Sequence, residues 1–143
     1  MTTCCIIGLG YIGLPTAAVL ACAGHRVIGV DVNSAVVATV NQGLIHIVEP
    51  DLDQAVATAV AAGALSAQPT PAPADVFLIA VPTPFRSGVD GIPQPNIGYV
   101  LAAARAIAPV LMPGNLVLLE STSPVGTTEQ VAQVIGEISG FNS

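Results

Sequence analysis

The sequence predicts an α/β fold in which helices cover both faces of a parallel sheet. Apolar runs typical of strands alternate along the chain with segments whose apolar residues recur at helical spacing. The runs at residues 4–7, 76–81 and 115–120 are almost unbroken, as strands buried on both faces require. Because successive parallel strands are joined by crossover helices, this alternation predicts one doubly wound domain with right-handed connections.

Glycines and capping residues divide the chain into its elements. Gly24, Gly43 and Gly140 are expected to end helices, because glycine adopts the left-handed conformation at no steric cost. Asp51 and Asn96 are expected to cap the helices that follow them. The expected elements are strand 4–7, helix 12–23, strand 25–30, helices 34–41 and 52–63, edge strand 65–68, central strand 76–81, an exposed loop to residue 95, helix 97–111, central strand 115–120 and helix 124–140.

The composition is that of a domain with a large core and few charges. Of 143 residues, 52% are hydrophobic and 8% are charged, and a chain of this length buries enough apolar surface to fold as one domain. Nine acidic residues against three arginines, with no lysine, give a formal net charge of −6. That charge argues against nucleic acid or an anionic membrane surface as a partner.

Residues 4–24 carry no charge and could be taken for a membrane span or a signal sequence. No basic segment precedes them, and four glycines and a proline interrupt them, so we reject both interpretations and expect a cytoplasmic protein. The three cysteines, Cys4, Cys5 and Cys22, are odd in number and form no C-x-x-C pair. We therefore expect buried thiols, no disulfide framework and no metal site.

A glycine-rich turn, GLGYIG at residues 8–13, follows the first strand. Its G-x-G-x-x-G pattern is weak alone, but here a buried strand precedes it and an apolar helix follows, the context in which it binds a dinucleotide. Gly8 permits the tight turn, Gly10 lets a pyrophosphate approach the backbone, and Gly13 lets the helix pack closely on the strand. The free N–H groups at the positive end of the helix hold the phosphates. This predicts a Rossmann-type domain, in which Tyr11 either covers the phosphates or packs.

Asp31 ends the second strand, about 20 residues beyond the glycines, where the dinucleotide fingerprint expects an acid. A carboxylate there accepts hydrogen bonds from the adenosine ribose and repels a 2′-phosphate. Asn33 offers no compensating positive charge. The sequence therefore predicts NAD as the cofactor in preference to NADP.

Further polar residues lie in loops at the carboxyl edge of the sheet, where ligands of such folds bind. Thr83 lies between two prolines. It either contacts the ribose or nicotinamide, or forms hydrogen bonds with local backbone groups in a rigid turn. Thr122 either orients water or a reacting oxygen, or caps the last helix, for which Ser123 is the better candidate. Glu120 either serves as a base near the nicotinamide or bonds backbone donors. The loops are those at residues 8–13, 31–33, 81–84 and 120–124.

Several residues are expected to have no role in the site. His25 follows a helix-ending glycine and His46 lies in a loop, so both are expected to be solvated side chains. Neither has a second ligand at metal-binding spacing.

Four segments together resemble the UDP-glucose/GDP-mannose dehydrogenase family: GLGYIGLPTA at 8–17, HIVEPDLD at 46–53, LIAVPTPF at 78–85 and LESTSPVGTTE at 119–129. The resemblance covers nearly the whole chain, and the pairing of V-P-T-P with S-T-x-P-V-G-T is far more specific than the glycine motif. The family oxidises the C6 hydroxymethyl group of a nucleotide sugar to a carboxylate, using two NAD per turnover and a covalent thioester on a cysteine. By resemblance, the adenosine and pyrophosphate are held by Gly8, Gly10, Tyr11, Ile12, Gly13 and Asp31, and the rest of the cofactor by Val81, Thr83, Ser121 and Thr122, with Thr122 also near the catalytic water.

The chain also departs from this family. The family's nucleophilic cysteine, its catalytic lysine and most sugar contacts follow a domain of this size, and this sequence stops at Ser143 without a lysine. Val36 stands where some relatives carry an arginine, and the loop of residues 86–94 is longer than in relatives. We therefore expect the NAD-binding half of the enzyme, inactive alone, with the UDP-sugar bound by the absent half and a homodimer at full length.

Two other interpretations remain open. The chain could be the cofactor domain of a β-hydroxyacid or hydroxyacyl-CoA dehydrogenase, which predicts downstream sequence without a glycine-flanked cysteine. It could also be a non-catalytic module that senses NAD, which predicts an open reading frame ending near Ser143.

Overall fold

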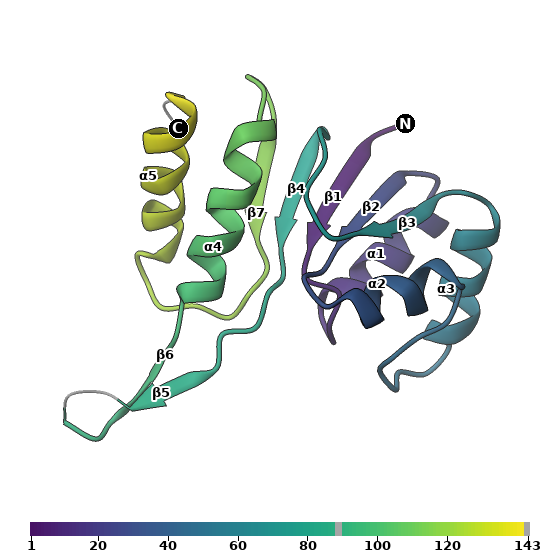
Figure 1. The fold of residues 1–143 in the computed structure, drawn as a ribbon, viewed down its shortest axis with the longest axis horizontal. Coiled ribbons are helices and arrows are strands. Elements are labelled where there is room, and N and C mark those ends of the chain that lie inside the picture. Colours follow the sequence, from purple (N-terminus) through teal and green to yellow (C-terminus); the bar gives the residue numbers. More distant parts are fainter. Residues whose placement is uncertain (88–89, 142–143) are drawn as a thin grey trace.

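The computed structural model describes residues 1–87 and 90–141 and confirms the predicted α/β class. Five parallel strands form one sheet in the order β3-β2-β1-β4-β7 (Figure 1). The strands of this sheet are β1 (Thr3–Ile7), β2 (Arg26–Val30), β3 (Leu65–Gln68), β4 (Val76–Ile79) and β7 (Leu116–Leu119). The helices are α1 (Gly13–Cys22), α2 (Ser34–Asn41), α3 (Leu52–Ala61), α4 (Gly98–Ile107), the 3₁₀ helix η1 (Ala108–Val110) and α5 (Thr127–Ser139).

Strand β1 lies at the centre of the sheet and separates two hydrophobic clusters. Successive side chains of a strand point to opposite faces. Cys4 and Ile6 accordingly belong to the cluster packed by α1, α2 and α3, whereas Cys5 and Ile7 belong to the cluster packed by α4 and α5. Because both faces are covered, every position from Cys4 to Ile7 is buried, which explains the unbroken apolar run in the sequence.

The chain changes face between β3 and β4. Helices α1, α2 and α3 lie on one side of the sheet and α4 and α5 on the other (Figure 1). Strands β2 and β4 flank β1, so the strand order reverses there. The turn that leaves β1 therefore sits at the point where ligands bind in open α/β sheets. Among the described residues, no helix is long and apolar enough to cross a membrane.

The segment after β4 differs from the exposed loop that the sequence predicts. Strands β5 (Phe85–Ser87) and β6 (Pro93–Pro95) form an antiparallel ribbon in which Arg86 pairs with Gln94. The ribbon projects away from the sheet in Figure 1. A two-stranded ribbon has a free edge on each strand, so the prolines of β6 remove no hydrogen bond from a neighbouring strand. Residues 88 and 89 of the predicted loop lie outside the described residues.

Strand β7 was predicted to be central and instead forms an edge of the sheet. Val117 and Leu119 pack against the cluster under α4 and α5. Leu116 and Leu118, on the opposite face, are 51% and 42% exposed. The central position was therefore wrong, because an apolar run does not reveal whether helices cover both of its faces.

The glycines predicted to end helices are confirmed, but only one of the two predicted helix caps makes its hydrogen bond. Gly24, Gly43 and Gly140 follow their helices with φ of +98°, +76° and +77°. Asn96 accepts the N–H of Gly98 at 2.9 Å, at the entrance to α4. Asp51 does not cap α3 through its side chain, because it adopts a left-handed conformation with φ of 63°.

Three other expectations were wrong. Helix α5 begins at Thr127, after Gly126, and not at residue 124. The helix predicted at 97–111 ends at Ile107 and continues as η1. Cys22 is exposed, because it lies at the outer side of the last turn of α1, whereas Cys4 and Cys5 are buried as predicted.

Candidate functional site

A cleft of about 620 Å³ opens at the carboxyl edge of the sheet, where the strand order reverses. All four predicted loops contribute to its wall. Gly13 does not line the cleft. The nine other predicted cofactor residues do: Gly8, Gly10, Tyr11, Ile12, Asp31, Val81, Thr83, Ser121 and Thr122.

The glycine turn is packed so closely that only glycine fits at two of its positions. Gly8 has φ of +100°, and an added Cβ would lie 2.7 Å from the backbone oxygen of Ala80. A Cβ on Gly13 would lie 1.7 Å from the backbone oxygen of Gly8. Nothing comes within 4 Å of a Cβ on Gly10. Gly8 and Gly13 thus shape the turn, and Gly10 leaves its open side free.

The backbone of the turn has N–H groups left to offer a ligand. The N–H of Gly8 is bonded to the oxygen of Val30 at 2.8 Å. The N–H groups of Gly10, Tyr11 and Ile12 donate no hydrogen bond within residues 1–87 and 90–141. They precede α1, whose dipole is positive at this end. Such a set of donors suits a phosphate group and needs no lysine.

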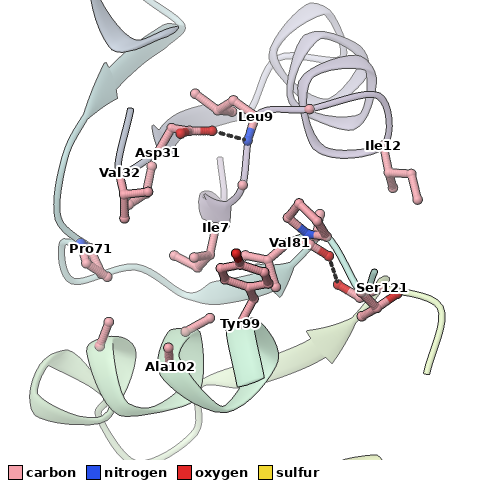
Figure 2. A pocket seen from close by; sticks show the side chains of 18 of the residues that line it. Ile7, Leu9, Ile12, Asp31, Val32, Pro71, Val81, Tyr99, Ala102 and Ser121 are labelled. Atoms are coloured by element: carbon pink, nitrogen blue, oxygen red, sulfur yellow. Dashed lines mark hydrogen bonds between the residues drawn. The ribbon is translucent and has the colours of Figure 1, made fainter. Parts of the chain in front are cut away.

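Asp31 extends from the end of β2 to the same turn. Its Oδ2 accepts the N–H of Leu9 at 3.0 Å and its Oδ1 accepts the N–H of Asn33 at 2.9 Å. Figure 2 shows the Asp31 carboxylate and Leu9 together on one wall of the cleft. Each carboxylate oxygen accepts more than one hydrogen bond, so both can still accept a ribose hydroxyl.

Ser121 ties the loop after β4 to the loop after β7. Its hydroxyl lies 2.8 Å from the backbone oxygen of Val81 and 3.3 Å from that of Ile79, and the side chain is buried. The bond to Val81 is visible in Figure 2. Ser121 lines the cleft and holds Val81, whose backbone lies beside Gly8 of the glycine turn.

Thr83 and Thr122 present hydroxyl groups that the described residues leave without partners. Neither hydroxyl makes a hydrogen bond in the part of the chain that the structure describes, and both residues line the cleft. Thr122 does not cap α5, since that helix begins five residues later. Ser123 does not cap it either, because its hydroxyl donates to the backbone oxygen of Ser121 at 3.0 Å.

The opposite wall was missed by the sequence analysis. It consists of one face of α4, with Tyr99 in the first turn and Ala102, Ala103 and Ala106 further along the helix. Tyr99, Ala102 and Pro71 are labelled on this side of the cleft in Figure 2. The spacing of three and four residues is that of one helix face. A pattern of small residues beside an aromatic ring was the available signal, but alanines in a helix usually indicate packing.

Glu120 and the two histidines occupy other places than expected. Oε2 of Glu120 accepts the hydroxyl of Thr16 at 3.0 Å, while its Oε1 is buried without a partner among the described residues. Neither Glu120 nor Thr16 lines the cleft. His46 is not simply solvated, because its Nε2 lies 2.6 Å from the backbone oxygen of Leu9. Nδ1 of His25 is buried, so that expectation was wrong as well.

The residues of the cleft fit NAD. Free N–H groups meet the needs of a pyrophosphate, a carboxylate meets those of a ribose, and apolar walls accept flat rings. The lining contains no lysine or arginine that could pair with a 2′-phosphate. No group of three or more histidine, cysteine, aspartate or glutamate side chains in the described part of the chain is placed to hold a metal ion.

Comparisons with known proteins agree with this geometry. Residues 2–141 match the UDP-glucose/GDP-mannose dehydrogenase family, NAD binding domain. The chain is 62% identical over 130 residues to an NDP-N-acetyl-D-galactosaminuronic acid dehydrogenase of Ralstonia nicotianae, covering 91% of this chain and 30% of the relative. It is 57% identical over 136 residues to the UDP-N-acetyl-D-mannosamine dehydrogenase of Escherichia coli (strain K12), covering 95% of this chain and 31% of the relative.

A solved structure gives the same result in three dimensions. The UDP-N-acetyl-mannosamine dehydrogenase Cap5O from Staphylococcus aureus superposes with a TM-score of 0.91 at 35% identity, covering 99% of this chain and 34% of that one. The chain therefore spans about a third of the length of the relatives it matches.

Proposed function

The chain belongs to the UDP-glucose/GDP-mannose dehydrogenase family and is its NAD-binding domain, and from this premise we propose that it serves an enzyme that oxidises UDP-N-acetylmannosamine to UDP-N-acetylmannosaminuronate. The observation that carries the proposal is the cleft, in which the free N–H groups of the glycine turn lie beside Asp31. The choice of sugar is supported by the names of relatives that are 57% to 59% identical to this chain.

The reaction needs a hydride acceptor twice. Conversion of the hydroxymethyl group to a carboxylate removes four electrons, so one sugar, two NAD and one water yield one carboxylate, two NADH and three protons. NAD supplies the acceptor for each hydride when it is bound. The residues of this chain bind and orient it, and the sugar would be bound by the part of the enzyme that corresponds to the other two thirds of the relatives.

Each wall of the cleft has a separate task in this proposal. Asp31 accepts the hydroxyls of the adenosine ribose, and the N–H groups after Gly8 bind the pyrophosphate. Tyr99 and the alanines of α4 exclude water from the opposite side. Thr122, whose hydroxyl is exposed beside the cleft, positions a water molecule or the substrate.

We propose that the chain alone binds NAD and catalyses no reaction. Two of its three cysteines are buried in β1, and the third lies on α1 outside the cleft. None of them is placed to form a thioester with a substrate in this site. In the full-length enzyme, which we propose to be a cytoplasmic homodimer, the reacting cysteine and lysine come from the remaining sequence.

A chimera tests whether this chain can serve as the cofactor domain of such an enzyme, with the sugar site supplied by the relative. The matching 136 residues of the Escherichia coli enzyme would be replaced by this chain, and NADH formation would be followed with UDP-N-acetylmannosamine. We expect two NADH per sugar consumed. A folded chimera that binds NAD and the sugar but forms no NADH would contradict the proposal.

Two controls complete the test. The chain alone should bind NAD by calorimetry but form no NADH with the same sugar. A chimera carrying Asp31→Ala should lose most of its activity at limiting NAD, since its cofactor site is damaged and its sugar site is not.

A further inference from the structure

His46 contacts the glycine turn from outside the cleft. It belongs to the loop between α2 and α3, and its Nε2 lies 2.6 Å from the backbone oxygen of Leu9. A carbonyl oxygen only accepts hydrogen bonds, so the ring carries a proton on Nε2 and donates it. The contact joins two segments 37 residues apart in the sequence.

Leu9 is consequently held at three points. Its N–H donates to Asp31 at 3.0 Å, and its carbonyl accepts from His46. Its side chain is fully buried over β2, where a Cβ on Gly29 would come within 2.8 Å of it.

The bond to His46 also sets the direction of the next N–H group. In a trans peptide the C=O and N–H bonds point in opposite directions. An oxygen of Leu9 held toward His46 therefore turns the N–H of Gly10 away from His46. Gly10 lines the cleft and His46 does not, and the described residues offer the Gly10 N–H no acceptor.

Apart from the bond to His46, the Leu9–Gly10 peptide makes no hydrogen bond among the described residues. Gly10 has no side chain to restrict it, and the space around its missing Cβ is open to 4 Å. A rotated peptide would turn the oxygen of Leu9 toward the phosphates in place of the N–H of Gly10. An oxygen in that position repels an anion.

We propose that His46 is a positioning residue for the cofactor, which locks the Leu9–Gly10 peptide so that the N–H of Gly10 is available to the pyrophosphate of NAD. This inference rests on the assignment of the cleft to NAD. It gives the segment HIVEPD a role in cofactor binding, although none of its residues lines the cleft.

Substitutions of His46 should separate this role from simple packing. His46→Ala should weaken NAD binding about 3- to 10-fold, the effect of one hydrogen bond. His46→Gln should restore most of the affinity, because its amide nitrogen lies as far along the side chain as Nε2. His46→Asn should not, since its amide nitrogen corresponds to Nδ1. Val48→Ala, in the same loop and 90% exposed, is the control and should bind NAD like the unmodified chain.

The experiment compares two ligands on the full chain. NAD would be titrated by calorimetry, and adenosine, which lacks phosphates and binds more weakly, by NMR, with the melting temperature of each variant recorded. We expect His46→Ala to lose affinity for NAD and to keep its affinity for adenosine.

Three results would overturn the inference while the unmodified chain still binds NAD. They are equal NAD affinity in His46→Ala, an equal loss for adenosine, and no difference between the Gln and Asn variants. If the unmodified chain binds neither ligand, the assignment of the cleft itself fails, and the inference fails with it.

Discussion

The carboxylate of Asp31 accepts the backbone N–H of Leu9 at 3.0 Å, across 22 residues of sequence. The bond joins the end of β2 to the turn after β1, so the acid that would hold the adenosine ribose also holds the turn that would bind the pyrophosphate. Two parts of one ligand are thereby recognised by two segments that fix each other.

Asp31 is the first position where this coupling can be tested. Asp31→Ala should weaken NAD binding about 10- to 100-fold, because a hydrogen-bonding charged group is lost from both the ribose and the turn. It should also reduce the discrimination against NADP, since the repelling charge is gone. Calorimetry with both cofactors measures each effect. Asp31→Asn is the matched control, which keeps one acceptor oxygen without the charge. Its affinity for NAD should lie between that of the unmodified chain and that of Asp31→Ala.

Substitution by alanine should lower stability at one glycine of the turn and weaken NAD binding at another. Gly13→Ala places a Cβ 1.7 Å from the oxygen of Gly8 and should lower the free energy of unfolding by about 3 kcal/mol or more. Gly10→Ala meets nothing within 4 Å and should leave stability nearly unchanged while weakening NAD binding. Urea denaturation and calorimetry on both variants check this. Equal effects of the two substitutions on stability would contradict the packing described for the turn.

Thr16 of α1 should stabilise the end of β7 through Glu120. Its hydroxyl lies 3.0 Å from Oε2 of Glu120 and 3.0 Å from the backbone oxygen of Ile12, and the other oxygen of Glu120 is buried without a partner in the described residues. Thr16→Val keeps the shape and removes the donor, so we expect a loss of about 1–3 kcal/mol in the free energy of unfolding. Thr16→Ser keeps the hydroxyl and should lose much less. If the two variants unfold at the same urea concentration, the bond contributes nothing to stability.

The thiols of β1 should make stability depend on pH in the alkaline range. Burial raises the pKa of Cys5 above its ordinary value of 9.0, and burial together with the negative charge of Asp75 does the same for the pKa of Cys4. Above pH 9 the unfolded chain releases these protons and the folded chain retains them. Stability should therefore be complete below about pH 9 and fall as pH rises toward the folded pKa values.

A thiol reagent and a urea titration measure this directly. At pH 8 only Cys22, the exposed thiol, should react rapidly, and Cys4 and Cys5 should react on unfolding. The urea midpoint should decrease between pH 8 and pH 10, and Cys4→Ala with Cys5→Ala should reduce that slope. Rapid reaction of all three thiols in the folded protein would contradict the burial of β1.

One wall of the cleft could be predicted from the sequence and the other could not, for a physical reason. The glycine turn and Asp31 are tied to the ends of strands, and strand ends follow from apolar runs and turn residues. Tyr99 reaches the cleft only because α4 crosses the far side of the sheet. That placement depends on the tertiary packing of the helix, which local patterns do not specify.

The contact of His46 shows a second limit. Its partner is a backbone oxygen of Leu9, and backbone groups leave no trace in residue types. The position of β7 shows a third, since Leu116 and Leu118 have the apolar character of a buried strand at an edge of the sheet. The α/β class with a parallel sheet was predicted, because strand and helix patterns alternate along the chain.

A structure of the chain crystallised with NAD tests the central claim most directly. We expect the pyrophosphate against the turn of residues 8–13, with the adenosine ribose on the Asp31 carboxylate and the nicotinamide end toward Val81 and Thr122. A cleft that stays empty at saturating NAD, or a cofactor bound elsewhere on the chain, would contradict it.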